Sequence, residues 1–126
     1  MELYRLAMDA YNRGDVDAFI AMTDPAVEWV PRTSGVEGGV TGHDGVRSWW
    51  EDQVAAFDAL HTEVHEVVDG GDWVVARVTS HMRGGESGVE LDIPFGHAAK
   101  MANGRCVRFE SFHTFEEALE AAGLSE

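Results

Sequence analysis

At 126 residues, of which 44% are hydrophobic, the chain is long enough to bury a core without metals or disulfides. Nine basic residues against 23 acidic ones give a formal net charge of −14, which repels phosphate backbones and anionic lipid and argues against nucleic-acid binding. A single cysteine, Cys106, excludes an internal disulfide, and neither an export signal nor a membrane-spanning run is evident. We therefore expect one cytoplasmic domain over residues 1–126, with no membrane partner.

The first half of the chain has the periodicity of helices. A first helix is predicted to end at Asn12-Arg13-Gly14, and its apolar positions are Leu3, Leu6, Ala7, Ala10 and Tyr11. Asp15 is positioned to cap a second, shorter helix. A short strand over Val27–Val30 and a glycine-rich loop over Pro31–Gly42 follow. A third, longer helix has a predicted buried face that consists of Val46, Trp49, Trp50, Val54, Phe57 and Leu60.

From His61 onward the pattern alternates with a period of two. Strands are predicted over 61–68, 73–83, 89–101 and 105–113, with turns over 69–72, 84–88 and 103–104. Pro94 lacks a backbone donor and predicts a bulge or kink in its strand. Thr114 and Glu117 form a capping box for a last short helix, which Gly123 ends. This order predicts an α+β fold with a strongly curved antiparallel sheet around the long third helix, which leaves a cavity.

Several segments carry a family resemblance, and they include residues 12–17, 24–29, 42–47, 102–105 and 117–124. Through them the whole chain resembles the SnoaL-like polyketide cyclases of the nuclear transport factor 2-like superfamily, which includes ketosteroid isomerase. The resemblance implies a cone-shaped fold and a homodimer joined through the outer face of the sheet. It does not specify a reaction, because the superfamily contains isomerases, cyclases, dehydratases and non-catalytic binding domains.

The last strand is predicted to line the cavity. Phe109, Ser111 and His113 share one face of it, because alternate side chains of a strand point to the same side. We expect Phe109 and Ser111 to contact a ligand, and His113 is a candidate catalytic residue. The resemblance implies that cyclases and epoxide hydrolases have a catalytic aspartate where this chain has Ser111. A hydroxyl cannot replace that carboxylate as a proton acceptor near neutral pH.

His97 is the leading candidate for a catalytic base. It shares a predicted inward face with Phe95, a candidate ligand contact, and an imidazole exchanges protons near neutral pH. The alternative is a histidine that is only hydrogen-bonded in the cavity wall.

Arg77 and Glu28 are candidates that depend on which way each side chain faces. The resemblance to epoxide hydrolases implies that Arg77 faces inward, where it could stabilise an oxyanion, and the alternative is an outward Arg77 paired with an acid. An inward Glu28 would have a raised pKa and could act as a base. The alternative is a solvated Glu28 beside a buried Trp29.

Tryptophans and histidines complete the candidate residues. Trp29 is a predicted ligand contact, and either Trp49 or Trp50 should reach the cavity, with Trp50 as our candidate. A metal site at His61 and His65 is rejected, because on a strand they are about 13 Å apart. No metal or organic cofactor is expected, and Cys106 is expected to be inert.

These observations predict a protein that binds a small apolar or carbonyl-bearing metabolite. As an enzyme it would transfer protons next to a carbonyl, in an isomerisation, dehydration or ring closure, with His97 or Glu28 as the base. Arg77 or a tryptophan indole would then stabilise the oxyanion. The alternatives are a non-catalytic ligand-binding or protein-interaction module, which Ser111 favours, and a structural dimer with a filled cavity.

Overall fold

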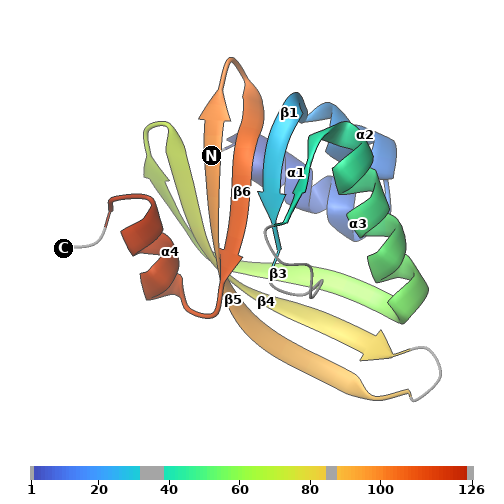
Figure 1. The fold of residues 1–126 in the computed structure, drawn as a ribbon. Coiled ribbons are helices and arrows are strands. Elements are labelled where there is room, and N and C mark those ends of the chain that lie inside the picture. Colours follow the sequence, from blue (N-terminus) through green and yellow to red (C-terminus); the bar gives the residue numbers. More distant parts are fainter. Residues whose placement is uncertain (1, 32–38, 85–87, 125–126) are drawn as a thin grey trace.

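A strongly curved sheet determines the shape of the molecule (Figure 1). The computed structural model describes residues 2–31, 39–84 and 88–124. Its helices are α1 (Glu2–Arg13), α2 (Val16–Ala21), α3 (Gly42–Ala56) and α4 (Phe115–Ala121). Its strands are β1 (Thr23–Val30), β2 (Val40–Thr41), β3 (Phe57–Gly70), β4 (Trp73–Gly84), β5 (Glu90–Ala102) and β6 (Arg105–Phe112). The predicted α+β fold is confirmed.

The six strands lie in the order β2-β1-β6-β5-β4-β3. Strands β3 to β6 form antiparallel neighbours in chain order, as the turns predicted. Strand β1, however, pairs with β6 in parallel, and within the described residues this pair departs from the antiparallel arrangement that was predicted. No tight turn joins these two strands, and their relative direction therefore depends on how α1 and α2 pack rather than on a local rule.

Local signals at the turns and helix ends are confirmed. Asn103 and Gly104 have φ values of 54° and 74°, the left-handed pair that a two-residue hairpin of the Asn-Gly type requires. Thr114 Oγ1 accepts a hydrogen bond from the Glu117 backbone N–H at 3.1 Å, and the Glu117 carboxylate accepts one from the Thr114 N–H. The Asp15 carboxylate caps α2 by accepting a hydrogen bond from the Ala18 backbone N–H at 3.1 Å.

The boundaries of two elements differ from the prediction. Strand β1 begins at Thr23 rather than at Val27, and α3 ends at Ala56, so Phe57 and Leu60 belong to β3. The side chain of Val54, predicted to be buried, is 58% exposed. Helix α3 ends before Phe57 because the long β3–β4 hairpin pairs Phe57 with Gly84, so sheet hydrogen bonds replace another helical turn.

Pro94 does not produce the predicted bulge in the β4–β5 pairing. The register is continuous from Trp73 opposite Lys100 to Arg83 opposite Glu90, with Pro94 opposite Thr79. On its other side β5 pairs with β6 only from Gly96 onward. Pro94 therefore lies on a stretch of β5 where, among the described residues, no second neighbour needs its missing donor.

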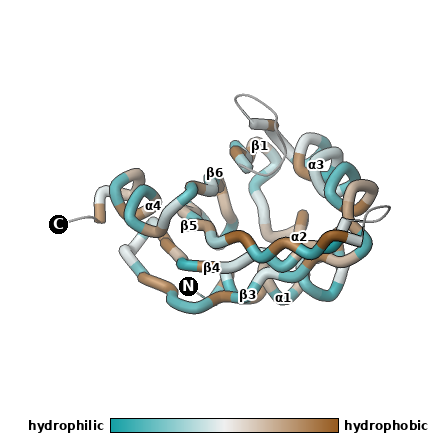
Figure 2. The backbone as a smooth tube through the Cα atoms, turned by 90° about the horizontal axis from the view of Figure 1, so that it is seen from below, coloured by the Kyte–Doolittle hydropathy of each residue, from teal (hydrophilic) through white to brown (hydrophobic). Residues whose placement is uncertain are grey.

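The two faces of the sheet are covered by different helices. The inner face packs against α1, α2 and α3, and the outer face packs in part against α4. Hydrophobic and hydrophilic positions alternate along the strands (Figure 2), as expected for a sheet with two different faces. Gly96 permits the contact with α4, because a Cβ atom there would lie 2.4 Å from the Thr114 carbonyl oxygen.

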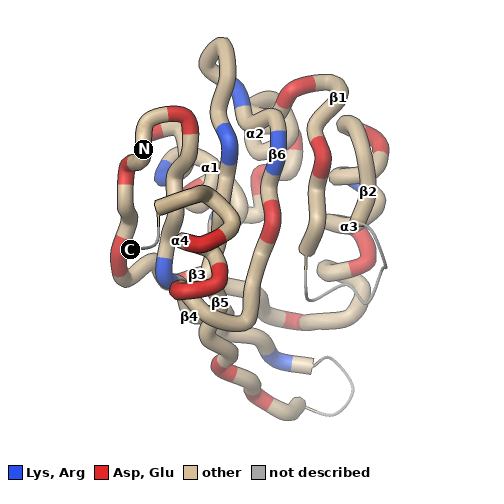
Figure 3. The backbone as a smooth tube through the Cα atoms, turned by 60° about the vertical axis from the view of Figure 1, so that its left-hand side comes forward, with Lys and Arg blue, Asp and Glu red and all other residues tan. Residues whose placement is uncertain are grey.

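Two further features of this fold are the placement of its charged residues and the hydropathy of its helices. Acidic residues are spread over helices and strands rather than gathered at one end of the molecule (Figure 3). No helix within the described residues is both long and apolar enough to span a membrane.

Candidate ligand pocket

A pocket lies between the helices and the inner face of the sheet, and we call it the central pocket. Its apolar and aromatic lining consists of Met8, Tyr11, Phe19, Trp29, Pro31, Trp49, Leu60, Met82, Phe95 and Phe109. Its polar lining consists of Gln53, Thr62, Ser80, His97 and Ser111, and His61 borders it although the His61 ring stacks on His81. No Asp, Glu, Lys or Arg occurs among these described lining residues. The pocket is therefore mostly apolar, and its polar groups are uncharged when the histidines are neutral.

His97 and Ser111 lie side by side in the pocket wall. They are opposite each other in the β5–β6 pairing, on the face that also carries Phe95 and Phe109. The sequence prediction that these four side chains face inward is confirmed, because the alternation of both strands is regular there. Trp29 also lines the pocket, as predicted.

The imidazole of His97 forms a hydrogen bond with a buried tyrosine. His97 is 8% exposed and Tyr4 is 2% exposed, and Tyr4 Oη lies 2.9 Å from His97 Nδ1. Burial lowers the pKa of His97 to about 4, because the apolar surroundings disfavour the imidazolium. Burial also raises the pKa of Tyr4. A neutral imidazole and a neutral phenol therefore share this hydrogen bond at neutral pH.

Tyr4 was not among the site residues predicted from the sequence. Of the apolar positions predicted for the first helix, Ala10 is buried and Tyr11 lines the pocket, whereas Leu6 is 47% exposed. The buried residues of α1 are Tyr4, Met8 and Ala10. A signal was present, since Tyr4, Met8 and Tyr11 recur at spacings of four and three. Gln53 was also not predicted, although it lies one turn after Trp49 and Trp50 and is buried with them.

Three aromatic rings continue the wall from His97. Phe109 packs edge-on against His97 at 4.8 Å and stacks on Trp29 at 4.2 Å, and Trp29 lies 5.3 Å from Trp49, all measured between ring centroids. The indole nitrogens of Trp29 and Trp49 are buried and have no hydrogen-bond partner within the described part of the chain. Buried donors without acceptors are uncommon and call for an explanation.

Trp50 is not a pocket residue, so this prediction is wrong and Trp49 takes its place. The ring of Trp50 packs against Tyr11 and Phe19 at centroid distances of 5.1 and 5.2 Å, and lines a surface groove between α1, α3 and β3 instead. Adjacent helical residues diverge by about 100°, and the exact rotation of α3 decides which tryptophan faces the cavity.

Arg77, Glu28 and His113 lie outside the pocket. Arg77 is on the outer face and its Nε lies 3.6 Å from a Glu66 carboxylate oxygen, with both side chains about half exposed. Glu28 is exposed and forms an ion pair with Arg108, its neighbour in the β1–β6 pairing. His113 is exposed between β6 and α4. For Arg77 the alternative of an outward side chain paired with an acid is observed, and for Glu28 the alternative of a solvated acid beside a buried Trp29. The inward position predicted for His113 is wrong, because this residue lies beyond the end of β6.

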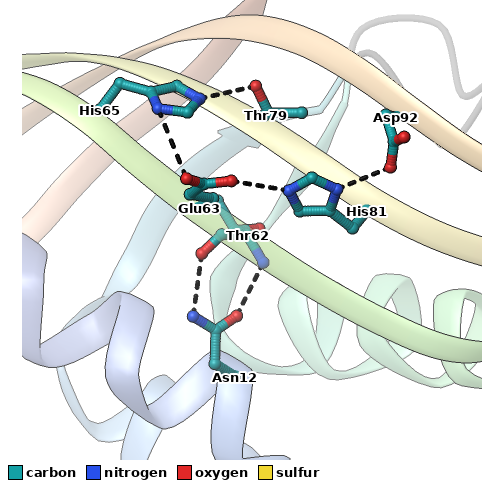
Figure 4. A network of polar contacts seen from close by, with 7 residues as sticks. All are labelled: Asn12, Thr62, Glu63, His65, Thr79, His81 and Asp92. Carbon is teal, nitrogen blue, oxygen red and sulfur yellow. Dashed lines mark hydrogen bonds and ion pairs between the residues drawn. The ribbon is translucent and has the colours of Figure 1, made fainter.

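The outer face carries a polar network across three strands, formed by Glu63, His65, Thr79, His81 and Asp92 (Figure 4). His81 Nδ1 lies 2.6 Å from Asp92 Oδ1, and His81 Nε2 lies 2.9 Å from Glu63 Oε1. We call this the outer-face network. Hydrogen bonding to Asp92 and then to Glu63 raises the pKa of His81. Within the described residues, no three His, Cys, Asp or Glu side chains are arranged to hold a metal ion.

A second, smaller cavity adjoins the central pocket behind His97. Its lining consists of Leu3, Tyr4, Ala7, Met8, Phe19, Met22, Thr23, Trp29, Ala99, Met101, Cys106 and Phe109. Burial raises the pKa of the Cys106 thiol to about 11, which keeps it protonated and unreactive at neutral pH. This cavity is almost entirely apolar, and the Tyr4 hydroxyl is one of its few polar groups.

Solved structures share this fold. A protein of unknown function with a nuclear transport factor 2-like fold, from Burkholderia pseudomallei, has a TM-score of 0.82 at 23% identity, over 95% of this chain and 94% of that one. TerC, crystallised with polyporic acid, has a TM-score of 0.80 at 22% identity, over 94% and 96% of the two chains. IdmH from Streptomyces antibioticus, a proposed polyketide cyclase, has a TM-score of 0.75 at 18% identity, over 88% of each chain.

These likenesses define the fold as nuclear transport factor 2-like, the class that includes ketosteroid isomerase-like proteins. The family model described as the SnoaL-like domain matches residues 4–109, and the chain belongs to this family. A search of curated proteins gave no match.

Proposed function

We propose that the central pocket binds a small, mostly apolar molecule that carries a carbonyl oxygen, with His97 as its polar contact. One observation carries this proposal: a buried, neutral imidazole lies in a wall that is otherwise largely apolar. An apolar pocket with a few convergent polar groups is the usual form of a small-molecule site. Trp29, Phe95, Phe109 and Ser111 would contact the same ligand.

The test is a binding titration with a simple aromatic ketone, 1-tetralone, followed by tryptophan fluorescence and by calorimetry. Replacement of His97 by Phe keeps a ring in the wall but removes its hydrogen-bonding atoms. We expect the affinity to fall about threefold to tenfold, as for the loss of one neutral hydrogen bond. Glu28→Gln, on the outer face, is the matched control and should bind as the wild type does. Equal affinities for the wild type and His97→Phe would contradict the proposal.

A second candidate function is proton transfer next to the ligand's carbonyl, in an isomerisation, dehydration or ring closure without metal or organic cofactor. It is favoured by the likeness to polyketide cyclases and by the seclusion of His97 from solvent. Against it, the described lining contains no carboxylate that could act as a base.

Hydrogen exchange separates the two candidates. Enolisation replaces the protons beside the ketone by deuterium in D₂O, which NMR detects directly. A catalyst would accelerate this exchange above the buffer rate, and His97→Phe would abolish the acceleration. Measurable binding with exchange at the buffer rate would instead support the non-catalytic, ligand-binding module.

We further propose that residues 1–126 act as one cytoplasmic domain that forms a homodimer through the outer face of the sheet. The free cysteine is compatible with a reducing compartment. Light scattering on the purified protein tests the dimer, and a monomer at all concentrations would reject it.

A further inference from the structure

The hydrogen bond between Tyr4 and His97 has a direction that the surroundings determine. Either the phenol donates to Nδ1, or a protonated Nδ1 donates to the phenol oxygen. The second cavity, which Tyr4 lines, is otherwise formed mainly by apolar and sulfur-containing side chains such as Leu3 and Met22. The one other hydroxyl in its lining, that of Thr23, donates to the Ile20 carbonyl oxygen and forms no hydrogen bond with Tyr4 within the described residues. Within the described residues, His97 Nδ1 is the hydrogen-bond partner recorded for this hydroxyl.

Only one of the two directions satisfies both groups. If Nδ1 donated, the phenol proton would be left in an apolar cavity without an acceptor, which is unfavourable. If the phenol donates, Nδ1 is an acceptor and the single proton of the neutral ring resides on Nε2. The low pKa of His97 agrees with a ring that carries one proton rather than two.

This tautomer decides what His97 offers to a ligand. Tyr4 lines the second cavity and is not among the residues of the central pocket, whereas His97 lines the central pocket. Nδ1 therefore faces away from the pocket toward Tyr4, and the other edge of the ring, with the Nε2–H group, is available to the pocket. His97 then presents a donor and no lone pair.

The unpaired indoles point to the same kind of ligand. The N–H groups of Trp29 and Trp49 are buried in the wall of the same pocket without acceptors among the described residues. An oxygen acceptor on a bound molecule would satisfy at least one of them after a small shift of the ring. Two independent features thus favour a ligand rich in acceptors.

We propose that Tyr4 is a positioning residue that holds His97 in the Nε2–H tautomer, so that the central pocket selects a carbonyl or enolate oxygen over the hydroxyl group of the same skeleton. This inference rests on the proposed function and specifies the ligand group that His97 recognises. It also assigns His97 the role of hydrogen-bond donor to the oxygen, and not that of a base at Nε2.

The tautomer can be measured without any ligand. In protein labelled with ¹⁵N in its histidine rings, the two ring nitrogens of each neutral imidazole have distinct shifts for N–H and for bare nitrogen. The His97 signals are assigned as those that His97→Phe lacks. We expect the proton on Nε2 in the wild type, loss of this preference in Tyr4→Phe, and no change in Tyr11→Phe, which removes a phenol from the same helix. A proton on Nδ1 in the wild type would overturn the inference.

Binding provides the second test, with 1-tetralone, its alcohol 1-tetralol and the hydrocarbon tetralin as probes. We expect the wild type to bind the ketone about threefold to tenfold more tightly than the alcohol, and Tyr4→Phe to lose this preference. Equal or tighter binding of the alcohol by the wild type would reject the inference but leave the proposed function intact. Failure of all three probes to bind would count against the proposed function, while the NMR experiment would still decide the tautomer.

Discussion

At the scale of single residues, the burial of His97 has a thermodynamic consequence. Its pKa is about 4 in the folded protein and 6.5 as an ordinary value. As the pH falls below 6.5, the unfolded chain takes up a proton at this residue, whereas the folded protein does so only near pH 4. Folding stability is therefore lost as the pH falls through this window, and is unaffected by His97 above it.

The prediction compares urea unfolding of the wild type with that of His97→Phe between pH 7 and pH 4. The free energy of unfolding of the wild type should fall by about 3 kcal/mol more than that of the variant over this range, because only the wild type has the shifted pKa of His97. Carboxylates titrate in both proteins and cancel in the difference. Parallel pH dependences for the two proteins would show that His97 is not buried as a neutral ring.

Alternation along two strands was enough to predict the pocket residues His97, Phe95, Phe109 and Ser111, since each strand has a regular pattern and a clear turn beside it. Alternation could not decide the orientation of Arg77, for which the inward position was implied by the family resemblance alone. Val75 and Val78, two positions before and one position after it, are both buried and lie on opposite faces of β4. In a strand that is buried on both faces, polar and apolar residues do not alternate, so the sequence does not show which side chains face inward.

At the scale of elements, the outer-face network links β3, β4 and β5. His81 has a raised pKa, so its favourable interactions are fully present below pH 6.5 and are lost as the pH rises through its folded pKa. Glu63 has a lowered pKa, so its contribution is present above about pH 4.5 and is lost as the pH falls. The network is therefore most stabilising between these limits. The ring of His61, stacked on His81, and the nearby His65 also face it.

The expected result is a pH-dependent effect of His81→Asn. Melting temperatures of the variant and the wild type should differ most near pH 5.5 and converge toward pH 9, since the wild-type histidine is neutral there. In the single chain the network is exposed to solvent, so the effect should be small, and burial of the network in the proposed dimer would enlarge it. A difference that stays constant from pH 5.5 to pH 9 would indicate packing rather than charge.

The contact between α4 and the sheet depends on Gly96. A Cβ atom at this position would meet the backbone at Thr114, which cannot move aside without displacing α4. We expect Gly96→Ala to lower the free energy of unfolding by about 1–3 kcal/mol, as in other cases of overpacking.

Gly70→Ala is the matched control, since its Cβ atom would meet only the flexible end of the Leu124 side chain. In a denaturant titration, Gly70→Ala should lower the free energy of unfolding clearly less than Gly96→Ala does. Similar losses in the two variants would mean that α4 adjusts its position easily.

Sequence signals predicted the elements better than their limits. The capping residues Asp15 and Thr114 and the Asn103–Gly104 turn act within a few positions of the chain, so their outcomes follow from local geometry. The end of α3 does not follow from local geometry. Phe57 belongs to β3 because it pairs with Gly84, which lies 27 positions later in the chain. Tertiary pairing outweighs a weak helical preference there.

At the scale of the whole molecule, ligand binding should appear as added stability. A ligand that binds only the folded state at 100 times its Kd raises the free energy of unfolding by about 2.7 kcal/mol. Saturating 1-tetralone should therefore raise the melting temperature of the wild type, and raise that of His97→Phe less at the same concentration. Thermal denaturation by circular dichroism measures this, and a shift of equal size in the two proteins would place the ligand away from His97.

The sequence by itself determined the family, the α+β class, the hairpins and caps, and the inward face of β5 and β6, because these follow from interactions between near neighbours or from a regular period of two. Only the tertiary structure decided that Trp49 and not Trp50 faces the pocket, that β1 runs parallel to β6, and that Glu28 pairs with Arg108 outside. It also brought Tyr4 to His97 across 93 positions of the chain. Contacts of that kind depend on how distant segments pack against each other, and no local pattern contains that information.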